Sequence, residues 1–162
     1  MARKSKSRKA TELDDVIHLR GLLEMQLLNA ETGEPIGDRL STNTVVTAGR
    51  RWVLSRIWTT DAQTISYMGV GTDTTAPATG QTELSSSISR LAIGTFTTTG
   101  LANNPPSWRA ETTFATNQCN TTLGEAGLFN SSSAGTMLSR VTFTTINKTT
   151  SNTLSISYTI SN

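Results

Sequence analysis

The run Leu154-Ser-Ile-Ser-Tyr-Thr-Ile160, near the end of the chain, decides the fold class. Apolar and hydroxyl residues alternate strictly in it, which is the period of a strand with one buried face and one face in water. Composition agrees, because apolar residues make up 35% and charged residues only 16% of the chain. Much of the remainder is threonine, whose branched Cβ suits strands better than helices. A mainly β protein is therefore predicted.

Comparable apolar segments recur along the chain between turn signals such as Asn29–Gly33 and Asn130–Gly135. The further strand candidates are 22–28, 35–40, 65–70, 88–99, 108–114, 123–129 and 137–143. About seven short strands separated by turns predict an antiparallel β-sandwich. One short helix and an extended N-terminal arm are expected beside it.

The helix is expected over about 47–58, with Thr47 as its N-cap. The pairs expected to form its apolar stripe are Val53 with Ile57 and Leu54 with Trp58. The basic residues expected on its other face are Arg50, Arg51 and Arg56. Surface charge is the default for such a face, so we interpret it as solvated helix surface rather than as a binding site.

Positive charge is concentrated at the N-terminus, although the net charge is only +2. Five of the 14 lysines and arginines lie in the first ten residues: Arg3, Lys4, Lys6, Arg8 and Lys9. Four apolar residues follow them: Leu13, Val16, Ile17 and Leu19. We therefore expect a basic arm over 1–20 and a single β-sandwich domain over 21–162. These nine residues are expected to bind a partner, the charged ones on an acidic surface and the apolar ones as anchors.

Several protein classes are not expected from this sequence. A single cysteine, Cys119, cannot form an intramolecular disulfide. No apolar stretch approaches the roughly 20 residues of a membrane helix, and no apolar segment follows the basic N-terminus as in a secretory signal. A soluble protein made in a cytoplasm, without membrane partners, is the expectation.

Catalysis is not expected either. Activation of a hydroxyl or thiol would require the single histidine, His18, which lies beside the arm. Histidine and cysteine are also too few for a usual zinc site, so neither metal nor cofactor is expected. Glu125 lies within a strand pattern, where a buried carboxylate needs a partner such as Arg90 or Arg140. A structural ion pair or an interface contact is the favoured interpretation of Glu125 over a catalytic acid.

An ordered set of short motifs gives the chain a resemblance. Its members are Asn43-Thr-Val-Val-Thr-Ala-Gly49, Ile65-Ser-Tyr-Met-Gly-Val-Gly-Thr-Asp-Thr-Thr-Ala-Pro77, Thr82-Glu-Leu84, Arg90, Gly124-Glu-Ala-Gly-Leu-Phe-Asn130 and Gly135-Thr-Met-Leu-Ser-Arg140. Over roughly 22–143 this succession resembles small virion structural proteins of tailed phages, including tail fibre and collar proteins. The resemblance implies a β-sandwich module that builds particles and carries no catalytic residues.

The expected function is thus that of a structural component of a tailed-phage virion, assembled in the host cytoplasm. A capsid cement or decoration protein on the head lattice is favoured, because the chain has neither the repeats nor the shaft of a fibre. The alternative is a tail, collar or fibre-type adaptor or receptor-facing protein. A packaging protein that contacts DNA is more remote, since the arm has no aromatic residue for base stacking. The expected partners are the major capsid protein or tail and neck proteins, and further copies of the chain in a homo-oligomer such as a trimer.

Overall fold

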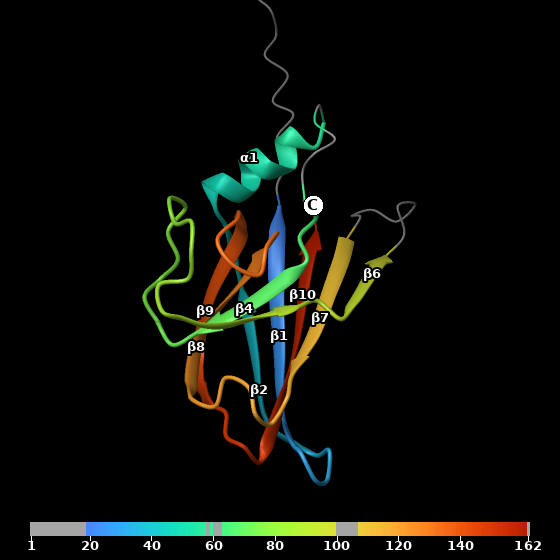
Figure 1. The fold of residues 1–162 in the computed structure, drawn as a ribbon, viewed down its shortest axis with the longest axis vertical. Coiled ribbons are helices and arrows are strands. Elements are labelled where there is room, and N and C mark those ends of the chain that lie inside the picture. Colours follow the sequence, from blue (N-terminus) through green and yellow to red (C-terminus); the bar gives the residue numbers. More distant parts are fainter. Residues whose placement is uncertain (1–18, 58, 60–62, 100–106, 162) are drawn as a thin grey trace, which may run out of the picture.

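The computed structural model describes residues 19–57, 59, 63–99 and 107–161 (Figure 1). Its elements are β1 (Arg20–Asn29), β2 (Pro35–Thr42), β3 (Thr44–Val45), α1 (Thr47–Ser55), β4 (Tyr67–Gly71), β5 (Ser87–Ala92), β6 (Thr95–Thr99), β7 (Ser107–Phe114), β8 (Thr122–Phe129), β9 (Met137–Asn147) and β10 (Asn152–Ser161). The prediction of a mainly β protein with one short helix is confirmed. The number of strands was wrong, since these residues form ten strands rather than about seven.

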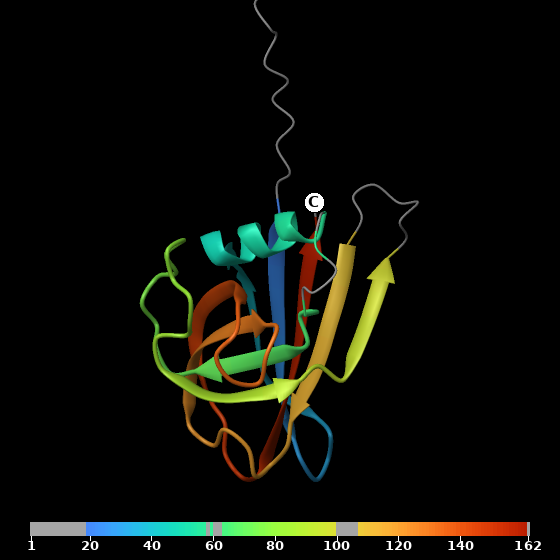
Figure 2. The same ribbon diagram turned by 45° about the horizontal axis from the view of Figure 1, so that its top comes forward.

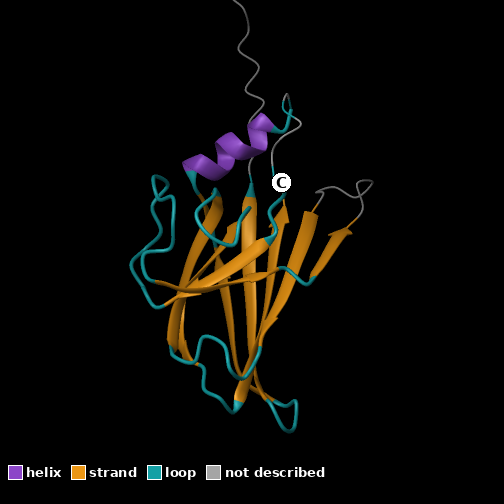
Figure 3. Cartoon of the chain, in the orientation of Figure 1, coloured by secondary structure: helices purple, strands orange, loops and turns teal. Residues whose placement is uncertain are grey.

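The strands form two five-stranded antiparallel sheets (Figures 1 and 3). Sheet A has the order β2-β1-β10-β7-β6, and sheet B has the order β3-β9-β8-β4-β5. The first and last strands lie side by side within sheet A, where β1 pairs with β10 over its whole length, from Arg20 opposite Ser161 to Asn29 opposite Asn152. This pairing brings the root of the N-terminal segment and the C-terminal end of the last strand to the same end of the molecule.

The candidate strand 88–99 is two strands in different sheets, which corrects the sequence-based prediction. β5 lies at an edge of sheet B and β6 at an edge of sheet A, and the chain passes between the sheets at Ile93 and Gly94 (Figure 2). The Ile93 amide donates to the Ser66 carbonyl, and the Gly94 amide donates to the Glu111 carbonyl. The local sequence stays strand-like across this crossing, so its pattern does not reveal that the pairing partner changes.

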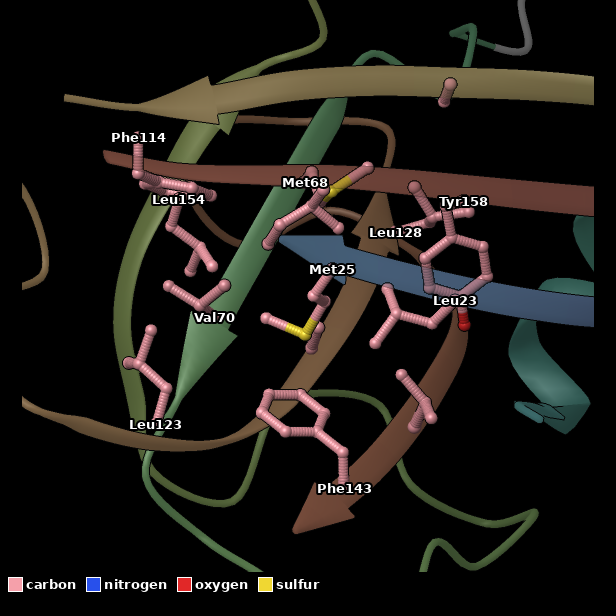
Figure 4. Packing of buried hydrophobic residues seen from close by; sticks show 14 of the residues in the cluster. Leu23, Met25, Met68, Val70, Phe114, Leu123, Leu128, Phe143, Leu154 and Tyr158 are labelled. Atoms are coloured by element: carbon pink, nitrogen blue, oxygen red, sulfur yellow. The ribbon is translucent and has the colours of Figure 1, made fainter. Parts of the chain in front are cut away.

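The main hydrophobic core is a cluster of buried side chains from both sheets (Figure 4). A smaller second cluster contains Val46, Leu84, Phe129 and Met137. β1 contributes Leu23 and Met25, while Met68 of β4 and Leu128 of β8 come from the other sheet. The Tyr158 hydroxyl of β10 lies 2.9 Å from the Ser139 hydroxyl of β9, so a buried hydrogen bond also joins the two sheets. Burial raises the pKa of Tyr158 far above its ordinary value, which keeps the hydroxyl protonated.

The strict alternation in 154–160 is confirmed as the inward face of β10. Its four apolar residues are all buried: Leu154, Ile156, Tyr158 and Ile160. The outward hydroxyl residues face water or other polar side chains, as Ser157 does by bonding to Arg109 and Glu111. Hydrophobic burial of one face of β10 therefore explains the alternation of apolar and hydroxyl residues.

The helix departs from its predicted limits and orientation. It spans Thr47–Ser55, and its N-cap is Val46, whose side chain makes no capping bond. Trp52 and Val53 pack against the core, whereas Leu54 and Ile57 are 47% and 75% exposed. The expected apolar stripe was therefore wrong for Leu54 and Ile57, and Trp58 lies outside the described residues. Gly49 lies directly against Leu138, and this contact orients the helix with Leu54 toward solvent. Ile57 lies beyond the end of the helix, which has Arg56 as its C-cap.

Candidate docking surface at the helix end

Eight of the nine residues predicted to bind a partner lie outside the described part of the chain: Arg3, Lys4, Lys6, Arg8, Lys9, Leu13, Val16 and Ile17. The ninth, Leu19, is half-buried and packs against the core of its own domain. The role of the arm therefore stays a prediction. The structure does show where the arm begins, which is the end of the molecule that carries α1 (Figure 1).

A close backbone contact holds α1 against the end of sheet B. The Val46 amide donates to the Leu138 carbonyl of β9 at 3.1 Å, and the Thr47 amide donates to the Thr79 carbonyl at 2.7 Å. Gly49 is buried directly over Leu138, and a Cβ atom at this position would overlap the Leu138 carbonyl. The helix can approach β9 this closely because residue 49 has no side chain.

We expect Gly49→Ala to destabilise the domain by about 1–3 kcal/mol, the usual cost of overpacking. The added methyl group would meet main-chain atoms of Leu138, which cannot rotate away as a flexible side chain could. Urea unfolding followed by circular dichroism measures the change. Gly80→Ala is the matched control, because a Cβ there meets no atom within 4 Å. Equal stability of the two variants would contradict the close contact.

A largely apolar pocket of about 350 Å³ lies beneath α1. Its lining residues are Leu19, Trp52, Val53, Arg56, Thr64, Ile65, Phe96, Trp108, Leu138 and Ile160. The Trp52 indole N–H donates to the Gln63 carbonyl at 3.1 Å, and the Arg56 guanidinium lies 5.4 Å from the centre of the Trp52 ring. Aromatic and aliphatic walls with little polar surface suit apolar side chains rather than a polar ligand.

The solvent side of this end combines positive charge with exposed apolar groups. Its exposed side chains include Arg20 at the start of β1, and Arg50, Arg51, Leu54 and Ile57 on or next to α1. We call these five residues the helix-end surface. Exposed large apolar side chains beside arginines are typical of a protein-binding surface, where the apolar groups add contact area and the charges orient the partner.

The other described cations are engaged within the domain. Arg90 pairs with Glu83, Arg109 with Glu24 and Glu111, and Arg140 with Asp73 and Glu125. Arg39 and Lys148 donate to main-chain carbonyls. By contrast, Arg20, Arg50 and Arg51 form no ion pair with any carboxylate of the described residues. Arg50 and Arg51 are exposed, which agrees with the sequence-based interpretation of this face as solvated helix surface.

Glu125 and Arg140 form a fully buried ion pair. The Arg140 Nε donates to a Glu125 carboxylate oxygen at 2.7 Å, and both side chains are 0% exposed. Glu125 also accepts the Ser85 and Ser86 amides, at 3.1 and 2.7 Å. The prediction that Glu125 has Arg90 or Arg140 as its partner is confirmed for Arg140.

Asp73 forms a second ion pair with Arg140, a contact that the sequence did not predict. Its carboxylate accepts Arg140 Nη2 at 2.8 Å. The hydrogen bond from the Thr75 hydroxyl, with a smaller contribution from Arg140, lowers the pKa of Asp73 below its ordinary 3.8. The sequence carries a signal for the Thr75 bond only, because Asp73-Thr-Thr75 is a local pattern in which a carboxylate accepts from a hydroxyl two residues later. The three charges together tie the loop after β4 to β8 and β9.

Two further groups of ionisable residues are held by contacts within the described part of the domain. On the outer face of sheet A, Arg109 bridges Glu24 and Glu111 at 2.8 and 2.7 Å, and its hydrogen bond lowers the pKa of Glu111. Near the β7–β8 loop, Lys148 donates to the Ala115 carbonyl at 2.7 Å. Burial raises the pKa of Cys119 to about 11, so this thiol is protonated and weakly nucleophilic at neutral pH.

Across the described ranges, no three histidine, cysteine, aspartate or glutamate side chains are grouped so that they could hold a metal ion. The same residues contain no helix that is long and apolar enough to span a membrane. No protein-family model and no curated protein matches the chain.

Proposed function

We propose that this chain is a structural protein of a tailed-phage virion, a cement protein that attaches to the head lattice by its N-terminal arm and helix-end surface. The observation that carries the proposal is the separation of exposed charge among the described residues of the domain. Arg20, Arg50 and Arg51 lie at the end where the arm begins, unpaired with any described carboxylate. Glu31 and Glu34 lie at the β1–β2 hairpin, at the opposite end of the molecule (Figure 1). This polarity favours docking of the arm end on an acidic surface.

The positions of the motifs that carry the resemblance also support a structural role. Their charged residues come from separate segments and form ion pairs with one another. Arg140 binds both Asp73 and Glu125, and Arg90 binds Glu83. Arg90 also lies over the Phe129 ring, with its guanidinium carbon 3.5 Å from the ring centre. These residues build the fold, and none is left free as an acid, base or nucleophile. We accordingly propose a non-enzymatic protein without cofactor.

The fold that we propose for this role is a β-sandwich. Two five-stranded sheets that contribute to one hydrophobic core support this interpretation. The hydrogen bond between Tyr158 and Ser139 across that core adds to it. Such a module offers a stable body, while the arm and the helix-end surface supply the attachment.

Mass spectrometry of gradient-purified particles tests the proposed function. A cement protein is expected in a fixed stoichiometric ratio to the major capsid protein, because it occupies a repeated lattice site. Far fewer copies, confined to tails, would support the alternative of a tail, collar or fibre-type protein. Absence from purified particles, with the protein found only in the lysate, would contradict both placements.

A comparison of empty and DNA-filled particles distinguishes binding to the head lattice from the more remote packaging role. Phosphate contacts by the arm would make occupancy depend on the packaged DNA and would weaken steeply with salt. A cement protein should occupy empty and filled heads equally. Loss of the protein from empty heads would favour the packaging role instead.

A further inference from the structure

The four edge strands of the two sheets differ in how they are protected from pairing with another chain. An unprotected edge presents free main-chain donors and acceptors, and proteins usually blunt it with charge, proline, bulges or short strands. β3 is only two residues long. β5 contains Arg90 and a bulge at its pairing with β4. β2 contains Pro35, and Arg39 reaches from β2 to the Thr144 and Thr145 carbonyls of β9. Each of these three edges therefore carries at least one protective feature.

β6 lacks all of these devices. Its sequence, Thr95-Phe-Thr-Thr-Thr99, contains no charged residue and no proline, and its register with β7 is regular. Residues 95–98 are exposed, and among the described strands only β7 pairs with β6. Phe96 points to the core side of sheet A, since it lies opposite buried Ala110 of β7, yet it remains 50% exposed beside Trp108.

We propose that β6 is a dimerisation edge, at which two copies of this chain pair antiparallel through a two-fold axis at Thr97 and join their A sheets into one. All five residues of β6 can pair with a second copy only if the two-fold axis passes through the middle residue, Thr97. In this register Thr95 lies opposite Thr99 of the second copy, and Phe96 lies opposite Thr98. Threonine pairs and aromatic–threonine pairs are favourable cross-strand neighbours. A strand without charged residues can also pair with a copy of itself, because the two-fold axis then brings no like charges close to each other.

This pairing explains the exposure of Phe96. Phe96 and Thr98 lie on the same face of β6, so the ring of the second copy would lie on that face too. The two Phe96 rings become diagonal neighbours across the new strand pair, at a separation that aromatic side chains can bridge. Each ring thereby covers the other beside the pocket that Phe96 and Trp108 line. A second copy is favoured over an unrelated strand because the edge is complementary to itself.

Light scattering coupled to size exclusion tests the proposal on the full chain. The wild-type protein should show the mass of two 17.4 kDa chains. Thr97→Lys should halve that mass, because two ammonium groups would then face each other at the two-fold axis. Thr97→Glu should behave in the same way, and an equimolar mixture of the two variants should regain the dimer, since opposite charges then face each other.

Thr113→Lys is the matched control, an equal change of charge at an exposed threonine of β7, which lies inside sheet A between β10 and β6. It should leave the dimer intact, and circular dichroism should show all variants folded. A wild-type monomer over the micromolar range would overturn the proposal. So would a mass that Thr97→Lys leaves unchanged, or a mass of three copies, because a two-fold edge pairing closes at two.

Discussion

Replacing Arg140 with methionine is expected to lower the free energy of unfolding by about 3–5 kcal/mol, the usual cost of removing one partner of a buried ion pair. The side chain is 0% exposed and donates to Glu125 and Asp73. It also donates to the Thr75 carbonyl at 3.0 Å. Methionine fills much of the same space but would leave the Glu125 carboxylate buried without its cation. Chemical denaturation of the purified protein measures the loss.

Arg109→Met provides the matched control for this prediction. Arg109 also bridges two carboxylates, but its side chain is 41% exposed, so water can replace the lost contacts. A cost of about 0–1 kcal/mol is expected, as for surface ion pairs. The double variant Arg140→Met with Glu125→Leu should recover part of the loss, because it removes the stranded carboxylate as well. If Arg140→Met lowered the free energy of unfolding no more than Arg109→Met, this would contradict the conclusion that the buried ion pair holds the loop after β4.

Deletion of residues 2–18 is expected to abolish attachment to the particle while the domain stays folded. This deletion removes eight of the nine predicted anchor residues but keeps Leu19, which packs against the domain core. Deletion of 2–10 removes only the five basic residues and should leave weaker, more salt-sensitive attachment. Fixing the backbone of a residue in one conformation costs roughly 1–2 kcal/mol. Charge alone should therefore not hold the arm on the particle, and the apolar residues should supply the remaining binding energy.

Binding of the two truncated proteins to particles that lack this protein, measured at low and high salt, tests this expectation. Thermal unfolding of each variant serves as the control for folding. Full occupancy by the 2–18 deletion in high salt would show that the arm is not the anchor. Charge reversal of Arg50 and Arg51 in the full chain then measures how much the helix-end surface adds.

The sequence predicted the candidate site only in part. It identified the basic arm and the two possible partners of Glu125, because clustered charge and a carboxylate within a strand are visible locally. It did not reveal that Asp73 joins Arg140, since these residues are far apart in the chain and meet through the packing of a loop against β9. The pocket under α1 was not predicted either, because its walls come from seven separate segments of the chain.

By itself the sequence determined that the chain is mainly β and which faces of its clearest strands are buried. In β10 and β7, alternation of apolar and polar residues reports burial directly, because each side chain must suit its own side of the sheet. Only the tertiary structure decided that 88–99 divides between two sheets and that Leu54 faces solvent. Both outcomes depend on contacts distant in sequence: the pairing of β5 with β4 and β6 with β7, and the approach of Gly49 to Leu138. A local sequence pattern indicates whether a residue is buried, but it does not indicate which distant segment covers that residue.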